Sequence, residues 1–223
     1  MKLRSMKLFF SCFLVVFIST QALLAKEIWQ EYSIQTKGIT IGSLTWGLKI
    51  TENKYEISVD LKDKGLLSRF YSFSGSYEAL GIVKKNKLFP TRYIQNWETS
   101  NKKKYVELNF KDNAVESMIL NPKEIEFARI QYKKLRGYKD PLSSFLSILI
   151  TKAQSYTIDG RRAYLLFPSK EGNKVLVKEY INIWADHKRN DLEYLEIYQD
   201  EKKILPEKII IKFKGSLFYI KKN

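Results

Sequence analysis

Cysteine and histidine are almost missing from this chain of 223 residues, since each occurs once, as Cys12 and His187. A disulfide needs two cysteines, and a zinc site draws on several Cys or His ligands. A Ser-His-Asp arrangement would have to use His187, but the chain has no G-x-S-x-G elbow. Glycine-rich phosphate loops and twelve-residue calcium loops are also lacking. We therefore predict no catalytic residue, no metal site and no cofactor.

The acidic residues add no motif to this picture. Asp191, Glu193, Asp200 and Glu201 lie close together in the sequence, but a solvated strand edge accounts for them. A hydrolase built on two carboxylates stays open as an alternative, because the separation of such a pair exists only in the fold. Our prediction is that the protein is not an enzyme.

The chain also lacks an apolar run long enough to cross a membrane. The run from Leu8 to Ile18 is about half the ~20 residues that a spanning helix needs. Basic residues precede it, and Ala22 or Ala25 offers a small-residue cleavage position after it. This pattern predicts a cleaved signal peptide at residues 1–25, which takes Cys12 with it; an uncleaved signal anchor is the alternative. We expect the remaining residues, 26–223, to form one domain in the periplasm.

Charge is strongly one-sided, with a formal net charge of +15 at pH 7. An anionic envelope surface is one expected partner of such a chain. Arg, which suits bidentate phosphate recognition, is scarce beside Lys, so the charge also fits a simple solubility role. Nucleic acid is excluded, because an exported protein without a reader motif does not meet it.

Alternation of apolar and polar residues dominates from Ile28 onward and predicts strands. Residues 44–50 and 55–61 alternate on either side of the turn at residues 51–54, which is typical of a hairpin. Residues 88–99 and 103–113 predict another. Residues 115–138 fit a helix and a strand equally, and we assign them to neither. Strands resume after residue 160, with no linker between the halves.

Residues 139–152, "KDPLSSFLSILITK", predict the one clear helix. Asp140 suits the N-cap, and Pro141 suits the first helical position. One face carries Leu142, Phe145, Leu146, Leu149 and Ile150, and the opposite face carries Ser143, Ser144, Ser147 and Thr151. We expect the apolar face to pack on strands and the serines to face water or a polar rim. The predicted fold is mainly β: a curved antiparallel sheet, partly open β-barrel or β-roll, with one amphipathic helix packed against it.

Aromatic residues on the strands suggest a site between sheet and helix. A curved antiparallel sheet can enclose one small ligand, and we predict a lipid or other hydrophobic ligand there. The candidate lining residues are Trp46, Leu48, Tyr71, Phe73, Leu142, Phe145, Leu146 and Leu149. Ordinary core packing explains the same residues. The alternative function is therefore a non-enzymatic scaffold or interaction module of the cell envelope with a filled core. Oligomeric state and protein partners are not predicted.

Several short motifs, taken in order, resemble a known family. They are "GITIGSLTWGLKI", "YEISVDLKDKGLLSRFYSFSGSYEALG", "LFPTRY", "KDPLSSFLSIL" and "IDGRRAYLL". This order is similar to that of domain-of-unknown-function family 3108, whose members are exported bacterial proteins. The resemblance implies an exported β-rich fold with one prominent helix, and it brings no catalytic residue. On fold alone, such a sheet with a helix in its concave side is similar to the periplasmic lipoprotein carriers.

Overall fold

A computed structural model describes residues 26–65, 72–170, 172–184 and 190–223 of the chain. The signal peptide predicted at residues 1–25 lies outside the described residues, as do Tyr71 and His187. No helix among the described ranges is both long and apolar enough to span a bilayer.

Within the described residues, the chain forms one antiparallel sheet of thirteen strands and one α-helix. The strands are β1 Lys26–Thr36, β2 Ile39–Ile50, β3 Lys54–Asp63, β4 Phe73–Lys84, β5 Lys87–Thr99, β6 Lys102–Lys111, β7 Ala114–Asn121, β8 Ser155–Ile158, β9 Arg162–Pro168, β10 Lys174–Asn182, β11 Leu192–Tyr198, β12 Lys208–Phe213 and β13 Ser216–Lys222. The helix α1 is Pro141–Thr151, and a short 3-10 turn, η2, is Tyr132–Lys134. The predicted hairpins are β2–β3 and β5–β6.

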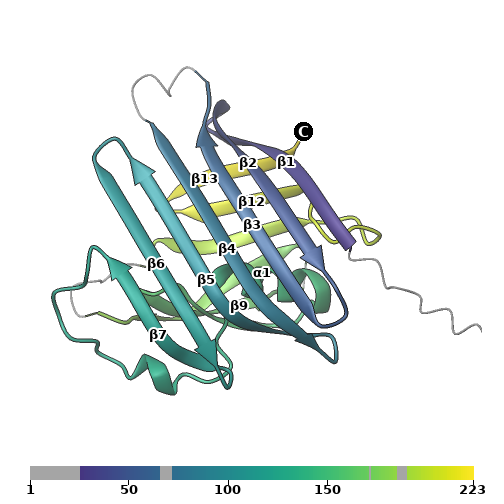
Figure 1. The fold of residues 1–223 in the computed structure, drawn as a ribbon. Coiled ribbons are helices and arrows are strands. Elements are labelled where there is room, and N and C mark those ends of the chain that lie inside the picture. The colour runs from purple at the N-terminus through teal and green to yellow at the C-terminus, as the bar shows by residue number, and fades with distance from the viewer. Residues whose placement is uncertain (1–25, 66–71, 171, 185–189) are drawn as a thin grey trace, which may run out of the picture.

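The sheet folds over on itself into two layers (Figure 1). The strand order is β7-β6-β5-β4-β3-β2-β1-β13-β12-β11-β10-β9-β8, so β1 to β7 make one layer and β8 to β13 the other. The layers join where β1 pairs with β13, from Tyr32 opposite Lys222 to Gln35 opposite Tyr219. The sheet does not close into a barrel, and the fold class predicted from the sequence is confirmed.

The segment between β7 and α1 reaches both end strands of the sheet. Arg136 makes an antiparallel bridge to Ala114 of β7, and Lys139 makes a parallel bridge to Thr157 of β8. Residues 115–138, which the sequence left unassigned, form most of β7 and then this segment. It follows β7 as irregular backbone with the η2 turn, and it leads directly into α1.

The core lies between the two layers, with α1 packed against β8, β5 and β4. Inward-facing side chains of many strands are almost fully buried, among them Tyr32, Ile57, Tyr93 and Leu108. Strands such as β3 alternate these with outward polar residues, as a sheet with one solvated face requires. Gly81 lets the ring of Tyr55 lie on the sheet, because a Cβ there would come within 2.3 Å of that ring.

Candidate functional site

The helix begins as the sequence predicts. Asp140 is the N-cap, and its Oδ1 accepts a hydrogen bond from the backbone N–H of Ser143 at 2.9 Å. Pro141 occupies the first turn, where a missing N–H costs nothing. The Asp140 carboxyl is completely buried, and Oδ2 has no hydrogen-bond partner among the described residues. Burial raises the pKa of Asp140 to about 6, against the hydrogen bonds of Ser143, which lower it.

The prediction that the helix serines face water or a polar rim is wrong. Ser143, Ser144 and Ser147 are buried, whereas Ile150, expected on the core side, is 42% exposed. The reason is that strands of both layers pack around α1, so both of its faces need partners. The Ser143 hydroxyl shares a 2.7 Å hydrogen bond with the hydroxyl of Tyr55, and Ser144 donates to the carbonyl of Tyr156. These bonds make burial of the hydroxyls tolerable.

The structure brings only some of the predicted lining residues together. Trp46, Leu48, Leu146 and Leu149 are buried, and Leu142 and Phe145 are half-buried. The ring of Phe145 packs on Trp46 with centroids 5.5 Å apart. Phe73 instead stacks on Trp97, at 5.6 Å. Tyr71 lies outside the described residues.

Side chains fill much of the space where this site was predicted. A hollow of about 230 Å³ lies at the far end of α1 and reaches Ile148, Leu149, Val175 and Ile197. Pockets for drug-sized ligands are usually about 300–1,000 Å³. Lipid binding between helix and sheet stays a prediction.

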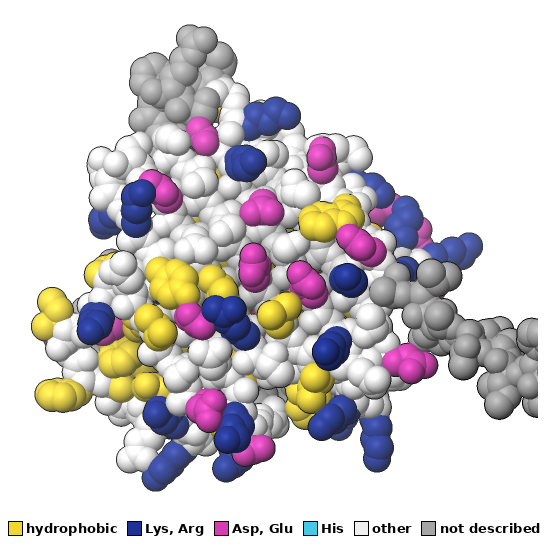
Figure 2. Space-filling model, in the orientation of Figure 1, with side chains coloured by type: hydrophobic (Ala, Val, Ile, Leu, Met, Phe, Trp, Pro, Cys, Tyr) yellow, Lys and Arg dark blue, Asp and Glu magenta, His cyan; other side chains and the backbone are white. Residues whose placement is uncertain are grey.

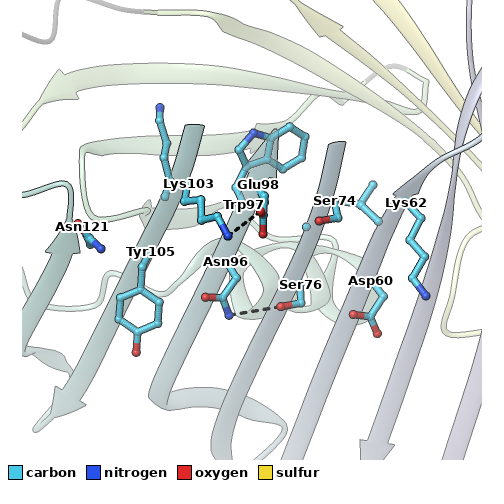
Figure 3. A pocket seen from close by; sticks show the side chains of 13 residues that line it. Asp60, Lys62, Ser74, Ser76, Asn96, Trp97, Glu98, Lys103, Tyr105 and Asn121 are labelled. Carbon is cyan, nitrogen blue, oxygen red and sulfur yellow. Dashed lines mark hydrogen bonds and ion pairs between the residues drawn. The ribbon is translucent and has the colours of Figure 1, made fainter. Parts of the chain in front are cut away.

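A larger hollow of about 560 Å³ lies on the layer of β1 to β7, lined by residues of β3 to β7 (Figure 3). Strand register builds it, because residues from distant parts of the chain stand opposite one another. One row runs across the strands as Asp60, Ser76, Asn96, Tyr105 and Asn121. The neighbouring row runs as Lys62, Ser74, Glu98 and Lys103. We call these nine residues the polar trough.

The polar trough presents donors, acceptors and charges of both signs. Asn96 donates to the hydroxyl of Ser76 at 3.3 Å, and Lys103 pairs with Glu98 at 2.7 Å. Ser74 and Ser76 are the smallest side chains of the two rows, so they form a low floor on β4 between taller neighbours. Asp60 and Lys62 stand on one side of this floor, and Asn96 and Glu98 stand on the other. The trough can hydrogen-bond a polar chain laid across it.

Sequence reasoning missed this trough. Its residues are the polar half of each alternating strand, which is the ordinary pattern of a solvated face. The available signal was the pair of serines on β4, which stand on either side of Gly75. Their register with Asp60 and Asn96 could not be read without the strand pairing.

The motif "IDGRR" proves to be a structural turn. One carboxylate oxygen of Asp159, Oδ1, accepts the backbone N–H of Arg161 at 2.9 Å and that of Arg162 at 2.8 Å. Gly160 has φ +91°, and a Cβ there would lie 2.7 Å from Val106. Its carbonyl accepts the indole N–H of Trp184 at 3.0 Å. Glycine is required because the backbone is left-handed and the layers meet closely at this point.

Arg161 extends this turn toward the segment after β7. Its Nε pairs with Glu124 at 2.5 Å, and Nη2 donates to the carbonyl of Pro122 at 3.1 Å. Both charged side chains are largely buried, at 12% and 7% exposed. Through Arg161, the turn therefore holds the start of that segment, at Pro122 and Glu124, against the sheet.

Comparison with known proteins agrees with the motif order. No curated protein and no solved structure matches the chain. A family model described as a protein of unknown function, DUF3108, matches residues 31–203. The match covers α1 and the strands that make the polar trough, together with the Asp159–Arg162 turn. The chain therefore belongs to the DUF3108 family.

Proposed function

We propose that this protein is a non-enzymatic binding module of the cell envelope, which works through its outer surface and takes a hydroxyl-rich glycan chain in the polar trough. The observation that carries the proposal is the contrast between the two hollows. Around α1 the space is occupied by Trp46, Phe145 and Leu146, whereas the trough is open and more than twice as large.

The chemistry of the trough favours a sugar polymer. Sugar hydroxyls donate and accept at once, and the serine, asparagine and aspartate side chains here offer both functions. Tyr105 adds an aromatic wall, held by a 2.5 Å hydrogen bond from its hydroxyl to Glu107. Lys62 and Lys103 stand beside Asp60 and Glu98, so amide- and carboxylate-bearing glycans find partners of either sign. No residue in the trough is paired as nucleophile and base, which supports a binding role.

Calorimetry tests the proposal with glycan fragments released from purified cell wall by a muramidase. We expect binding by the protein and a loss of about tenfold or more in Ser76→Gln, because the longer side chain fills the floor. Ser33→Gln is the matched control, since Ser33 is a half-buried residue on the same face of the sheet and β2 separates it from the trough. Equal affinity in Ser76→Gln and the parent, or no binding of any fragment, would refute the proposal.

A carrier of lipid is the second candidate, and the hollow at Leu149 favours it. Native mass spectrometry of protein purified from the periplasm, with organic extraction, separates the two. A reproducible lipid adduct supports the carrier. A clean mass after incubation with envelope lipids supports the outer-surface module.

A further inference from the structure

The segment that follows β7 holds two large apolar side chains in water. Ile125 is 97% exposed and Phe127 is 95% exposed. Ile119, near the end of β7, is 52% exposed. Figure 2 shows hydrophobic side chains at the left edge of the molecule, over β7 and the segment after it. We call Ile125 and Phe127 the apolar tip. Large apolar groups exposed together mark a contact surface.

The apolar tip is held in place on both sides. Before it, Glu124 is bound by Arg161, and the carbonyl of Pro122 accepts a second bond from the same guanidinium. After it, Ala128 bridges to Trp184, and the N–H of Arg129 donates to the carbonyl of Ile183 at 2.6 Å. The short stretch between these anchors therefore projects Ile125 and Phe127 from a fixed base.

The segment that carries the apolar tip is rich in exposed positive charge. Exposed cations of the same segment are Lys123, Arg129, Lys133, Lys134 and Arg136. The acidic residues nearby are Glu124 and Glu126, and the carboxylate of Glu124 is already paired with Arg161. The segment as a whole is basic, in a chain whose formal net charge is +15. A partner that offers an apolar interior together with negative charge would complement this segment.

We infer that the apolar tip inserts into the interface of an anionic phospholipid bilayer, with exposed cations of its segment on the head groups. Its size favours a bilayer over a protein partner. Two or three side chains offer a few hundred Å² of apolar area, whereas a stable protein interface takes roughly 800 Å² from each partner. A small projecting tip suits a lipid surface, which closes around whatever enters it. The inference does not rest on glycan binding.

Vesicle co-sedimentation of the protein, isolated from cells that express the full chain, tests the inference. The vesicles are phosphatidylcholine alone or phosphatidylcholine mixed with phosphatidylglycerol. We expect binding to the mixed vesicles, weakening with added salt. The double variant Ile125→Ser/Phe127→Ser should lose about tenfold or more of the affinity for the mixed vesicles, because two large apolar side chains no longer leave water on binding.

The matched control is Ile39→Ser/Ile150→Ser, which removes two other exposed isoleucines, 51% and 42% exposed. It should bind as the parent does, and because all chains share residues 1–25, any contribution of those residues cancels. An unchanged urea midpoint in both variants shows that they fold. Equal binding of the parent and the tip variant, equal binding to neutral and anionic vesicles, or no binding at all would overturn the inference.

Discussion

Asp140 should make the protein less stable as the pH rises toward neutrality. Its carboxyl is buried at the start of α1, and the ionised form leaves Oδ2 without a partner among the described residues. Burial raises its pKa from the ordinary 3.8 to about 6. The informative change is Asp140→Asn, because the amide oxygen can still accept the N–H of Ser143 while the charge is gone.

The size of the effect follows from proton linkage. A carboxyl that binds its proton more tightly in the folded state contributes stability that is fully present below pH 3.8 and is lost as the pH passes about 6. This contribution therefore falls by about 2.5 kcal/mol between pH 4 and pH 7.5. The free energy of unfolding of Asp140→Asn, relative to the parent, should therefore rise by about this amount across that range. The new amide donors change the stability difference equally at low and at high pH, so the dependence of that difference on pH is the diagnostic quantity.

Urea unfolding followed by tryptophan fluorescence at several pH values measures this slope. Glu107→Gln is the control of opposite sign. Hydrogen bonds from Tyr105, and then from Arg92, lower the pKa of Glu107, so its contribution is present at neutral pH and is lost as the pH falls through the lowered value. A stability difference between Asp140→Asn and the parent that does not change with pH would refute the reasoning.

Three further predictions concern stability and the interior. Gly81→Ala should cost about 1–3 kcal/mol in urea unfolding, because its Cβ would meet the ring of Tyr55. In a Tyr55→Ala background, where that ring is gone, Gly81→Ala should cost less, and equal costs in the two backgrounds would contradict the packing argument. Glu124→Gln should cost about 3 kcal/mol by leaving Arg161 buried without its counter-charge, and a loss below 1 kcal/mol would show that the pair is effectively solvated. Phe145→Ala should lower the thermal midpoint and open space beside Trp46, so that an apolar dye binds the variant and not the parent; dye binding by the parent would instead favour a cavity already present.

The strands and the helix start could be predicted because each depends on local sequence. Alternation along β2 and β3 fixes which side chains face the core, and Asp140 and Pro141 fix where α1 begins. What the helix faces depends on strands of both layers, which lie before and after it in the chain. The partner of Ser143 is Tyr55, and no pattern near residue 143 announces it.

The polar trough was out of reach for a related reason. Ser76 lies between Asp60 and Asn96 only because of how β3, β4 and β5 pair. The apolar tip was hidden differently, since Ile125 and Phe127 alternate with charges like residues of an ordinary strand. Their exposure is what distinguishes them from residues of a packed strand. The contacts to Arg161 and Ile183 hold the chain on both sides of them and leave the stretch between projecting into solvent.

The joint between β1 and β13 has a consequence for how the protein folds. Ser33 stands opposite Lys221, so the first described strand obtains one of its two neighbours only from the last. Contacts so distant in sequence are formed late, because the entropy of closing a long loop is lost before the contacts stabilise the chain. A chain still emerging from a narrow passage could build hairpins, but it could not join the two layers until its final strand arrived. Completion of the sheet is thus tied to the arrival of β13.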